Sequence, residues 1–508
     1  MMRGIYIFDS EESFRPYRLS TVAGGDGPRM VGAAGPTAGY LVPHEHGNYA
    51  ALIIHSETRP VRFVYKQYIH QLLHDTLPGL PLWLRHGLAE YYSTFEIEDG
   101  YASIGLPVKP HLQRLVHGRG EQFLPLSDLL TGNELPRNPG TTSSFLARSW
   151  TLVHYLMTAD SKLSAQLPEF ARKVLTGVSA REAFEEAFDI DLRTLETQLD
   201  AHVRSKEFKY ARVAIDRGAH PIRMTPMKGH EVLYRLGDLL AHNGSERYAE
   251  AAVLLESALE LKPDHGLSWA GLGYLAELQD DDAAALESYR KAAGHAEDDS
   301  LVQYLYGASL IRSLKDRRPE NEAEQADLDA AIAALRRATE LRPDFAPAWA
   351  SLGYAHNLEP EASVQAVEVL EKAADLLPAR VDVAFNLLLA YARVGDRVGA
   401  DAAVAKMRRL GADEATLARS REVLLQMDYR DANRLVRDGR LDDAIAVFAR
   451  IQAETANPAL QRQAAERLEK LEPAAQHNRF GALYNQAANL LKEGRNDEAA
   501  AVAEQLLA

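Results

Sequence analysis

Trp269-Ala270-Gly271-Leu272-Gly273 returns later in the chain as Trp349-Ala350-Ser351-Leu352-Gly353, and this recurrence decides the fold of the second half. A leucine or tyrosine followed by glycine occupies the same slot at two further points. The slots follow one another at intervals of 36, 34, 46 and 35 residues, at Gly237, Gly273, Gly307, Gly353 and, with leucine in place of glycine, Leu388. An internal period near 34 residues is typical of chains built from repeated helix pairs.

The residues around each slot fit antiparallel helix pairs. Small residues recur where the second helix must pass close to the first, at Ala258, Ala292, Ala338 and Ala373. Prolines then end these second helices, because proline has no N–H to donate, at Pro263, Pro343 and Pro378. The pattern resembles the tetratricopeptide repeat (TPR). It predicts an all-α solenoid over residues 230–508, with five clear units and two to three more divergent ones.

One interval is longer than the others because of a charged, apolar-poor segment at about 317–328. We expect this segment to be a surface insertion between the two helices of one unit. Turns inside the divergent units are predicted at Gly395-Asp396, Gly439-Arg440 and Gly494-Arg495.

Four tyrosines stand at equivalent places beside the glycine slots, which puts them on one side of the first helices. They are Tyr234, Tyr274, Tyr304 and Tyr354. One interpretation is that they pack between repeats, as aromatic residues at helical spacing often do. The other is a peptide-binding groove on the concave face, lined by these tyrosines, with Asp238, Glu277 and Asn357 at its rim. A protein or peptide partner is expected there.

The composition narrows the class of partner. With 508 residues and a formal net charge of -15, the chain would repel a phosphate backbone, so nucleic acid is not expected. Zero cysteines exclude thiolate zinc sites and disulfides. No apolar stretch is long enough for a membrane span. The sequence as written predicts a cytoplasmic protein, or an exported one if the natural chain starts earlier.

Residues 1–215 mix strands and helices and predict an α+β domain, joined by a linker at 216–229 to the repeats. Candidate strands are Gly4–Phe8, Gly39–Val42 and Tyr49–His55. Apolar residues at helical spacing predict a helix from Pro60 to Thr76 and a second one over Leu82–Ser93.

The second of these helices carries Trp83-Leu84-Arg85-His86-Gly87-Leu88-Ala89-Glu90-Tyr91. This stretch resembles the peptidase MA-like gluzincins, zinc peptidases in which an H-E-x-x-H helix precedes W-L-N-E-G-L-A-E-Y. The resemblance covers about residues 1–215. It places Lys66, Gln67 and His70 on the first His, the catalytic Glu and the second His, and His86 on the third ligand.

The chemistry of that family requires neutral imidazoles one turn apart and a carboxylate to take a proton from metal-bound water. Protonated Lys66 has no lone pair, and Gln67 is no general base at neutral pH. The resemblance therefore implies a vestigial site without catalysis or cofactor. An alternative is a zinc peptidase with another ligand set, His70 and His86 with His74 or Glu90.

Three functional hypotheses follow. The first is a non-catalytic pseudopeptidase–TPR adaptor, whose front domain binds an extended chain along an edge strand, with Tyr49–His55 as the candidate. The second is the metallopeptidase with the alternative ligand set. The third gives the front domain a structural role only, as a cap on the open end of the solenoid.

Overall fold

The computed structural model describes residues 2–18, 39–44, 47–53, 60–77, 79–117, 124–132, 134–215, 225–315, 317–361 and 364–507. The chain divides into two compact units. The first contains Met1–Glu361 and Glu368–Val383, and the second contains Ala362–Val367 and Ala384–Ala508. The front region and the first repeats therefore belong to the same unit.

A three-stranded sheet opens the first unit. Its central strand is β3 (Asn48–Ile53), which pairs in parallel with β1 (Met2–Phe8) and antiparallel with β2 (Gly39–Val42). All three strands confirm the sequence prediction, although the last residues of the third lie outside the described residues. The expectation that this third strand forms an edge is wrong, because both of its sides already pair with neighbours.

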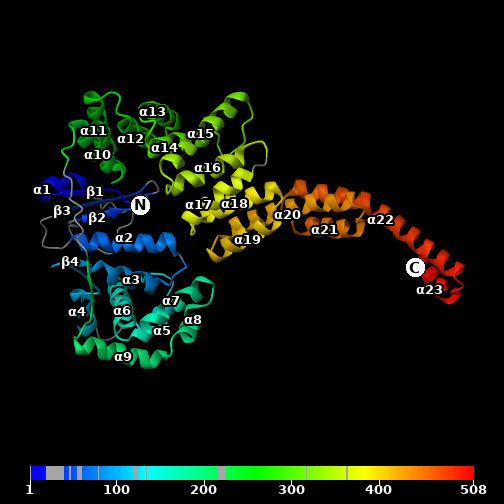
Figure 1. Ribbon diagram of the computed structural model, residues 1–508, viewed down its shortest axis with the longest axis horizontal. Coiled ribbons are helices and arrows are strands. Elements are labelled where there is room, and N and C mark those ends of the chain that lie inside the picture. The colour runs from blue at the N-terminus through cyan, green and yellow to red at the C-terminus, as the bar shows by residue number, and fades with distance from the viewer. Residues whose placement is uncertain are drawn as a thin grey trace. The chain divides into compact units, whose positions relative to one another are not determined.

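The sheet is covered on both faces. Alternate residues of β2 and β3 pack with Phe14 of α1 (Glu11–Phe14) and with Leu239 of α10 (Gly229–Ala241). The residues between them, including Ala50 and Leu52, pack on Val64 of α2 (Pro60–Thr76). In Figure 1 the sheet accordingly lies between α10 and α2. Because successive side chains of a strand point to opposite faces, the sheet packs on α2 of the front region with one face and on α10 of the first repeat with the other.

The rest of the front region is mostly helical. Helix α3 (Leu82–Ser93) packs on α6 (Pro139–Thr158), and Trp83 and Trp150 are fully buried. A Cβ on Gly87 would come within 2.5 Å of the Ser149 carbonyl oxygen, so this close helix contact requires glycine. The remaining helices are η1 (Arg15–Tyr17), α4 (Lys109–His117), α5 (Leu126–Thr131), α7 (Ser161–Leu175), α8 (Ala180–Ala187) and α9 (Leu192–Ser205). A second sheet contains β4 (Glu96–Glu98), β5 (Tyr101–Ile104) and β6 (Ala211–Ala214).

Antiparallel helix pairs follow, as the repeat pattern predicts. The pairs in the first unit are α10 with α11 (Tyr248–Leu261), α12 (Gly266–Glu277) with α13 (Asp282–His295), and α14 (Ser300–Ser313) with α15 (Glu322–Leu341). A 3-10 turn, η2 (Ser245–Arg247), precedes α11, and α16 (Ala346–Leu358) follows α15. Gly273 lies against Tyr289 and Gly307 against Leu335 of the partner helices, which explains the small residue in the slot.

The insertion at 317–328 is only partly a loop. Asn321 caps α15, and Glu322 onward extends this helix to 20 residues, against 14 in α11 and in α13. Leu328 is fully buried in the core of the repeats. The second half of the segment is therefore a helical extension, whose last residue, Leu328, reaches the core while Glu322, Ala323 and Ala326 are exposed.

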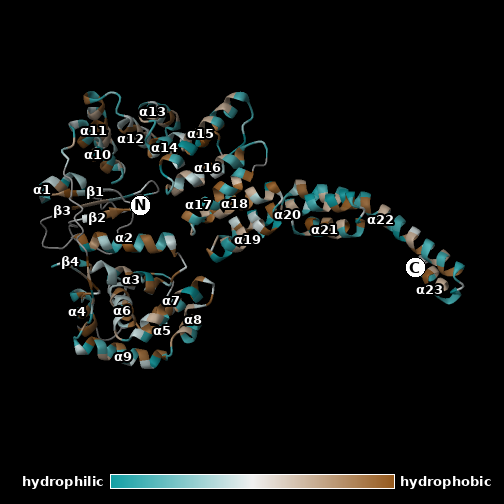
Figure 2. Ribbon diagram, in the orientation of Figure 1, coloured by the Kyte–Doolittle hydropathy of each residue, from teal (hydrophilic) through white to brown (hydrophobic). Residues whose placement is uncertain are grey.

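The second unit continues the helical pattern. Its helices are α19 (Arg397–Arg409), α20 (Glu414–Arg437), α21 (Leu441–Glu454), α22 (Pro458–Lys492) and α23 (Asn496–Leu507), and both units share α17 (Val364–Leu376) and α18 (Val381–Val394). Gly395, Gly439 and Gly494 have positive φ and lie at the predicted turns. Helix α22 runs for 35 residues without a turn, and hydrophilic residues cover much of α20 and α22 in Figure 2. Among the described residues, no helix combines the length and the apolar character that crossing a membrane requires.

Candidate functional site

The site that the sequence analysis singled out forms where α2 packs on α3. Arg62, Lys66 and His70 follow one another at intervals of four residues along α2, which places them on one side of that helix. His86 and Glu90 are likewise four residues apart on α3, and both are almost completely buried. Helical spacing therefore brings three basic residues of one helix against an imidazole and a carboxylate of the next.

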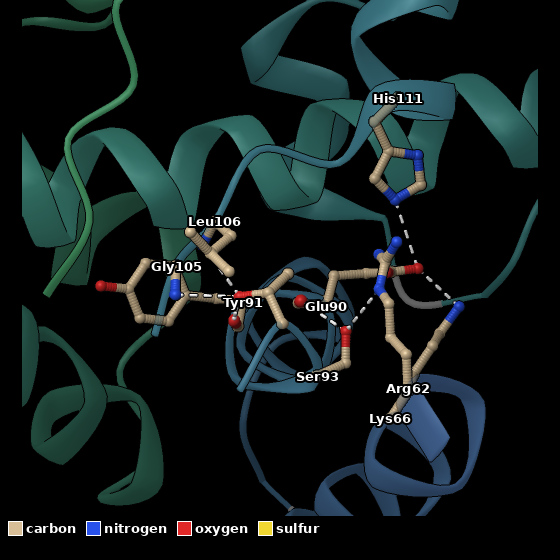
Figure 3. A network of polar contacts seen from close by, with 9 residues as sticks. Arg62, Lys66, Glu90, Tyr91, Ser93, Gly105, Leu106 and His111 are labelled. Carbon is tan, nitrogen blue, oxygen red and sulfur yellow. Dashed lines mark hydrogen bonds and ion pairs between the residues drawn. The ribbon is translucent and has the colours of Figure 1, made fainter. Parts of the chain in front are cut away.

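Glu90 is the centre of a polar network (Figure 3). Lys66 Nζ lies 2.5 Å from Glu90 Oε1, and Arg62 Nη2 lies 3.0 Å from Oε2. From α4, His111 Nε2 lies 3.2 Å from Oε1. Ser93 links the edges of the network, since its hydroxyl donates to the Glu90 carbonyl oxygen and accepts from Arg62 Nε. Three basic side chains from two helices thus surround one buried carboxylate.

Burial and charge act in opposite directions on Glu90. Burial by itself would raise its pKa, but the Lys66 ammonium and the hydrogen-bonding His111 hold the pKa well below the usual range of a glutamate. Glu90 is therefore an anion with its charge already balanced. A carboxylate in this state is a poor general base, because protonating it would leave the neighbouring cations without a counterion.

His70 and His86 form a second, uncharged part of the site. Their ring centroids are 4.6 Å apart. Burial lowers the pKa of His70 to about 4, with a further contribution from the cation Arg85. Burial lowers the pKa of His86 to about 3, and His70 adds to the effect. Neither His70 Nε2 nor His86 Nδ1 has a hydrogen-bond partner among the described residues, so two neutral imidazoles meet with unused ring nitrogens.

The residues present do not fit a catalytic zinc ion. Position 66 carries an ammonium, which has no lone pair while protonated, and Glu90 is committed to the network. His74 Nδ1 lies 3.4 Å from an Arg85 guanidinium nitrogen. The described part of the chain includes every residue of the alternative ligand set, and in that part no three His, Asp or Glu side chains are grouped to hold a metal ion. The alternative set of His70 and His86 with His74 or Glu90 is therefore not assembled.

Part of this network was not predicted from the sequence. Arg62 could have been found, since it stands one helical turn before Lys66 on the same side of α2. His111 and Ser93 gave no signal, because neither belongs to the motif and His111 comes from another helix. Gln67, the position of the catalytic glutamate in the family that the sequence resembles, is half-buried on α2.

The residues predicted to line a groove on the repeats differ in how far their side chains are buried. Tyr234 and Tyr304 are 2% and 4% exposed and belong to the hydrophobic cores of the repeats. Tyr354 is half-buried beside the same core as Tyr304, and Asn357 is buried. The packing interpretation therefore describes Tyr234 and Tyr304. An accessible groove cannot include these two side chains, since a ligand would not reach them.

Glu277 is tied to the neighbouring helices. Its carboxylate accepts a hydrogen bond from the Tyr289 hydroxyl, at 2.9 Å, and pairs with Arg312 of α14 at 2.7 Å. It therefore links three helices of successive pairs instead of standing at a free rim.

Asp238 and Tyr274 contact the front sheet of the same chain. The Tyr49 hydroxyl on β3 donates to Asp238 Oδ2 at 3.0 Å, and His44 Nε2 lies 2.8 Å from the Tyr274 hydroxyl. The His242 ring stacks on Tyr274 with centroids 4.6 Å apart. We call this contact, with Leu239 beneath it, the sheet–α10 interface.

A second group of hydrogen bonds extends this interface. The Tyr40 hydroxyl of β2 donates to the Tyr17 carbonyl oxygen at 2.6 Å, and the Asn243 amide donates to the same oxygen at 2.8 Å. Asn243 and Tyr40 also contact each other at 3.0 Å. Buried polar groups are thus paired across the interface, as a permanent intramolecular contact requires.

Comparisons with known proteins assign the chain to no family. No model of a known protein family matches it, and no curated protein matches it. Among solved structures, the TPR protein YrrB, described as having an unusual peptide-binding site, is 18% identical over 37% of this chain and 90% of its own, with a TM-score of 0.32. The thermophilic TPR protein TTC0263 of Thermus thermophilus is 21% identical over 39% and 99%, with a TM-score of 0.29. Pseudomonas aeruginosa pilF is 22% identical over 46% and 98%, with a TM-score of 0.32.

Proposed function

We propose that the chain is a non-catalytic adaptor, in which a peptidase-like front region is joined to a TPR-type scaffold that holds a protein partner. The observation that carries the proposal is the sheet–α10 interface. There the first helices of two successive pairs already hold a folded polypeptide, through hydroxyl–carboxylate and aromatic contacts. The equivalent sides of α14 and α16 continue the same surface along the repeats and are the proposed place for a partner.

The front region fits a structural and binding role better than chemistry. Its one buried carboxylate at the α2–α3 contact is neutralised by Lys66 and Arg62, and Gln67 offers an amide where a base would be needed. The region also covers the side of α10 that would otherwise expose Leu239. This supports the hypothesis that it caps the first helix pair, in addition to any partner that it binds.

A footprint of a captured partner tests the scaffold role. The full chain would be used for affinity capture, and each recovered protein would be purified and returned to it for hydrogen exchange. We expect slower exchange in the first helices α14 and α16 than in their second helices. Protection confined to the second helices, or no protein that binds on return, would contradict the proposal.

A peptidase assay tests the non-catalytic part separately. The full chain would be incubated with a peptide library, with added zinc and, in parallel, with a chelator. We expect no cleavage in either case, because the site lacks a free base. Chelator-sensitive cleavage that disappears in the His70→Ala and His86→Ala variants would instead support the metallopeptidase.

A further inference from the structure

Two histidines of the front region contact the segment that follows α9, and the adaptor role makes no use of them. Segment 206–214 turns back at Lys206, which has a φ of 57°, and ends as β6, which pairs with β5. Its side chains are exposed except that of Phe208, which is half-buried. The Phe208 ring packs on His154 of α6 and on His202 of α9, with centroids 5.4 and 4.9 Å apart. One aromatic side chain thus anchors the segment on two imidazoles.

The hydrogen bonds of the two imidazoles fix where their protons lie. His154 is fully buried, and its Nε2 lies 3.1 Å from the Gly105 carbonyl oxygen. A carbonyl oxygen only accepts hydrogen bonds, so Nε2 of the neutral ring carries the proton and Nδ1 keeps its lone pair. The nearby Thr158 hydroxyl donates to the His154 carbonyl oxygen at 2.7 Å. His202 Nε2, 3.2 Å from His154 Nδ1, is therefore the donor to that nitrogen.

The groups around the pair provide no counter-charge for an imidazolium. Tyr91 of α3 and Tyr155 of α6 face the rings, and burial raises the pKa of both phenols. Asp200 of α9 pairs with Arg148 and Arg204 instead. No acidic side chain of the described residues pairs with either imidazole. The other charged side chains near the segment are exposed to solvent, and they are Lys206, Glu207 and Lys209.

An added proton is therefore costly while the segment is in place. Burial lowers the pKa of His154 to about 4, and His202 adds to the effect, although the backbone groups of Gly105 and Lys209 act in the other direction. Burial also lowers the pKa of His202. A second proton on the pair would in addition set two N–H groups against each other at their contact. The charged rings gain hydration only if the segment that covers them moves away.

We infer that Phe208 and the His154–His202 pair form a latch, which holds segment 206–214 on the front region at neutral pH and releases it on acidification. The released chain takes up protons that the closed chain does not, so release becomes more favourable as the pH falls below 6.5 and levels off near 4. One imidazole with these two pKa values raises the opening equilibrium about 20-fold between pH 7 and pH 5.

Hydrogen exchange of the full chain at pH 7 and pH 5, corrected for the intrinsic exchange rate at each pH, tests the latch. The amides of β6 report whether the segment is in place, since this strand pairs with β5. We expect opening of 206–214 to increase about 20-fold at the lower pH. The control His295→Gln, at an exposed histidine of α13, should show the same increase. His154→Gln should lose most of it, and His202→Gln part of it.

A further variant covers the case in which a change at the fully buried His154 disturbs folding. Phe208→Ala removes the anchor, so segment 206–214 should exchange rapidly already at pH 7 while α6 and α9 stay protected. The inference is wrong if exchange of 206–214 is the same at both pH values, or if both histidine variants keep the full increase. Opening of α6 and α9 by the same factor as the segment would also overturn it, because the front region would then be unfolding as a whole.

Discussion

Replacing Glu90 with glutamine would remove the charge that holds the α2–α3–α4 contact together. The carboxylate is 3% exposed and is approached by Lys66, Arg62 and His111. Glutamine has nearly the same shape but leaves an ammonium and a guanidinium, 20% and 33% exposed, without their counterion. Removing one partner of a buried pair typically costs about 3–5 kcal/mol, and the partial exposure of the two cations puts our expectation at the low end, about 3 kcal/mol.

The stability that Glu90→Gln loses relative to the wild type should depend on pH, and the direction follows from the pKa of Glu90. The folded-state pKa of Glu90 lies below its ordinary value of 4.5, so the unfolded chain takes up this proton first as the pH falls. The stabilisation is complete above about pH 4.5 and is lost progressively below it. The Glu90→Gln chain lacks this contribution at every pH, so the difference between the two proteins should shrink on acidification.

Hydrogen exchange followed by mass spectrometry is the suitable assay, because a chain with two compact units does not unfold in a single transition. Peptides from α2, α3 and α4 should exchange faster in Glu90→Gln by about the factor that 3 kcal/mol implies, roughly 100-fold. Glu185→Gln is the matched control, since Glu185 forms an exposed ion pair with Arg181 on α8. Its effect should stay within about 0.5 kcal/mol. Equal exchange in wild type and Glu90→Gln would refute the assigned role of the network.

Three other changes give distinct outcomes. Tyr49→Phe removes the hydroxyl that donates to the buried Asp238 carboxylate. The free energy of opening in β3 and α10, measured by hydrogen exchange, should fall by about 1–3 kcal/mol, whereas the control Tyr210→Phe, at an exposed position, should leave it unchanged. Unchanged exchange in α10 would contradict the sheet–α10 interface. Gly87→Ala should speed hydrogen exchange in α3 and α6, because the added Cβ would meet the Ser149 carbonyl oxygen, although alanine favours helices by about 1 kcal/mol over glycine; slower exchange in both helices would show that they separate easily. His86→Gln should flatten the acid sensitivity of α2–α3 exchange between pH 6.5 and about 3, because the wild-type imidazole is neutral when folded and takes up its proton on unfolding; an unchanged pH profile would assign that sensitivity to other groups.

The sequence predicted those features that depend on local periodicity. The bounds of α2 and α3 agree with the apolar spacing and with the prolines between them, and the helix pairs agree with the glycine slots. The order of the strands in the sheet could not be predicted, because the residue pattern of β3 indicates that this strand is buried but not which strands pair with it. The extension of α15 was not predicted for another reason. The charged composition of 317–328 suggested a surface insertion between two helices, but Asn321 caps a helix that begins at Glu322 and Leu328 is buried in the core.

The site was predicted in its positions but not in its contacts. Lys66 and His70 lie one turn apart on α2, and His86 and Glu90 lie one turn apart on α3. Because α2 packs on α3, the four side chains meet at one place. That Lys66 would pair with Glu90 could not be read from spacing alone, since the pair joins two helices whose packing depends on Gly87. The partner of Asp238 was further from prediction, because the Tyr49 hydroxyl comes from 189 residues earlier in the chain.

That separation also has a consequence for synthesis on the ribosome. The face of the front sheet that carries Tyr49 receives Asp238, with Leu239 next to it, only after a further 189 residues have been translated, which takes roughly 10 to 40 s at ordinary rates. Of the described residues that precede α10, those that pack on this face from outside the sheet are Phe14 of α1 and Tyr17 of η1. Chaperone occupancy of the growing chain should therefore fall when α10 emerges from the exit tunnel, and not when the front region has been translated.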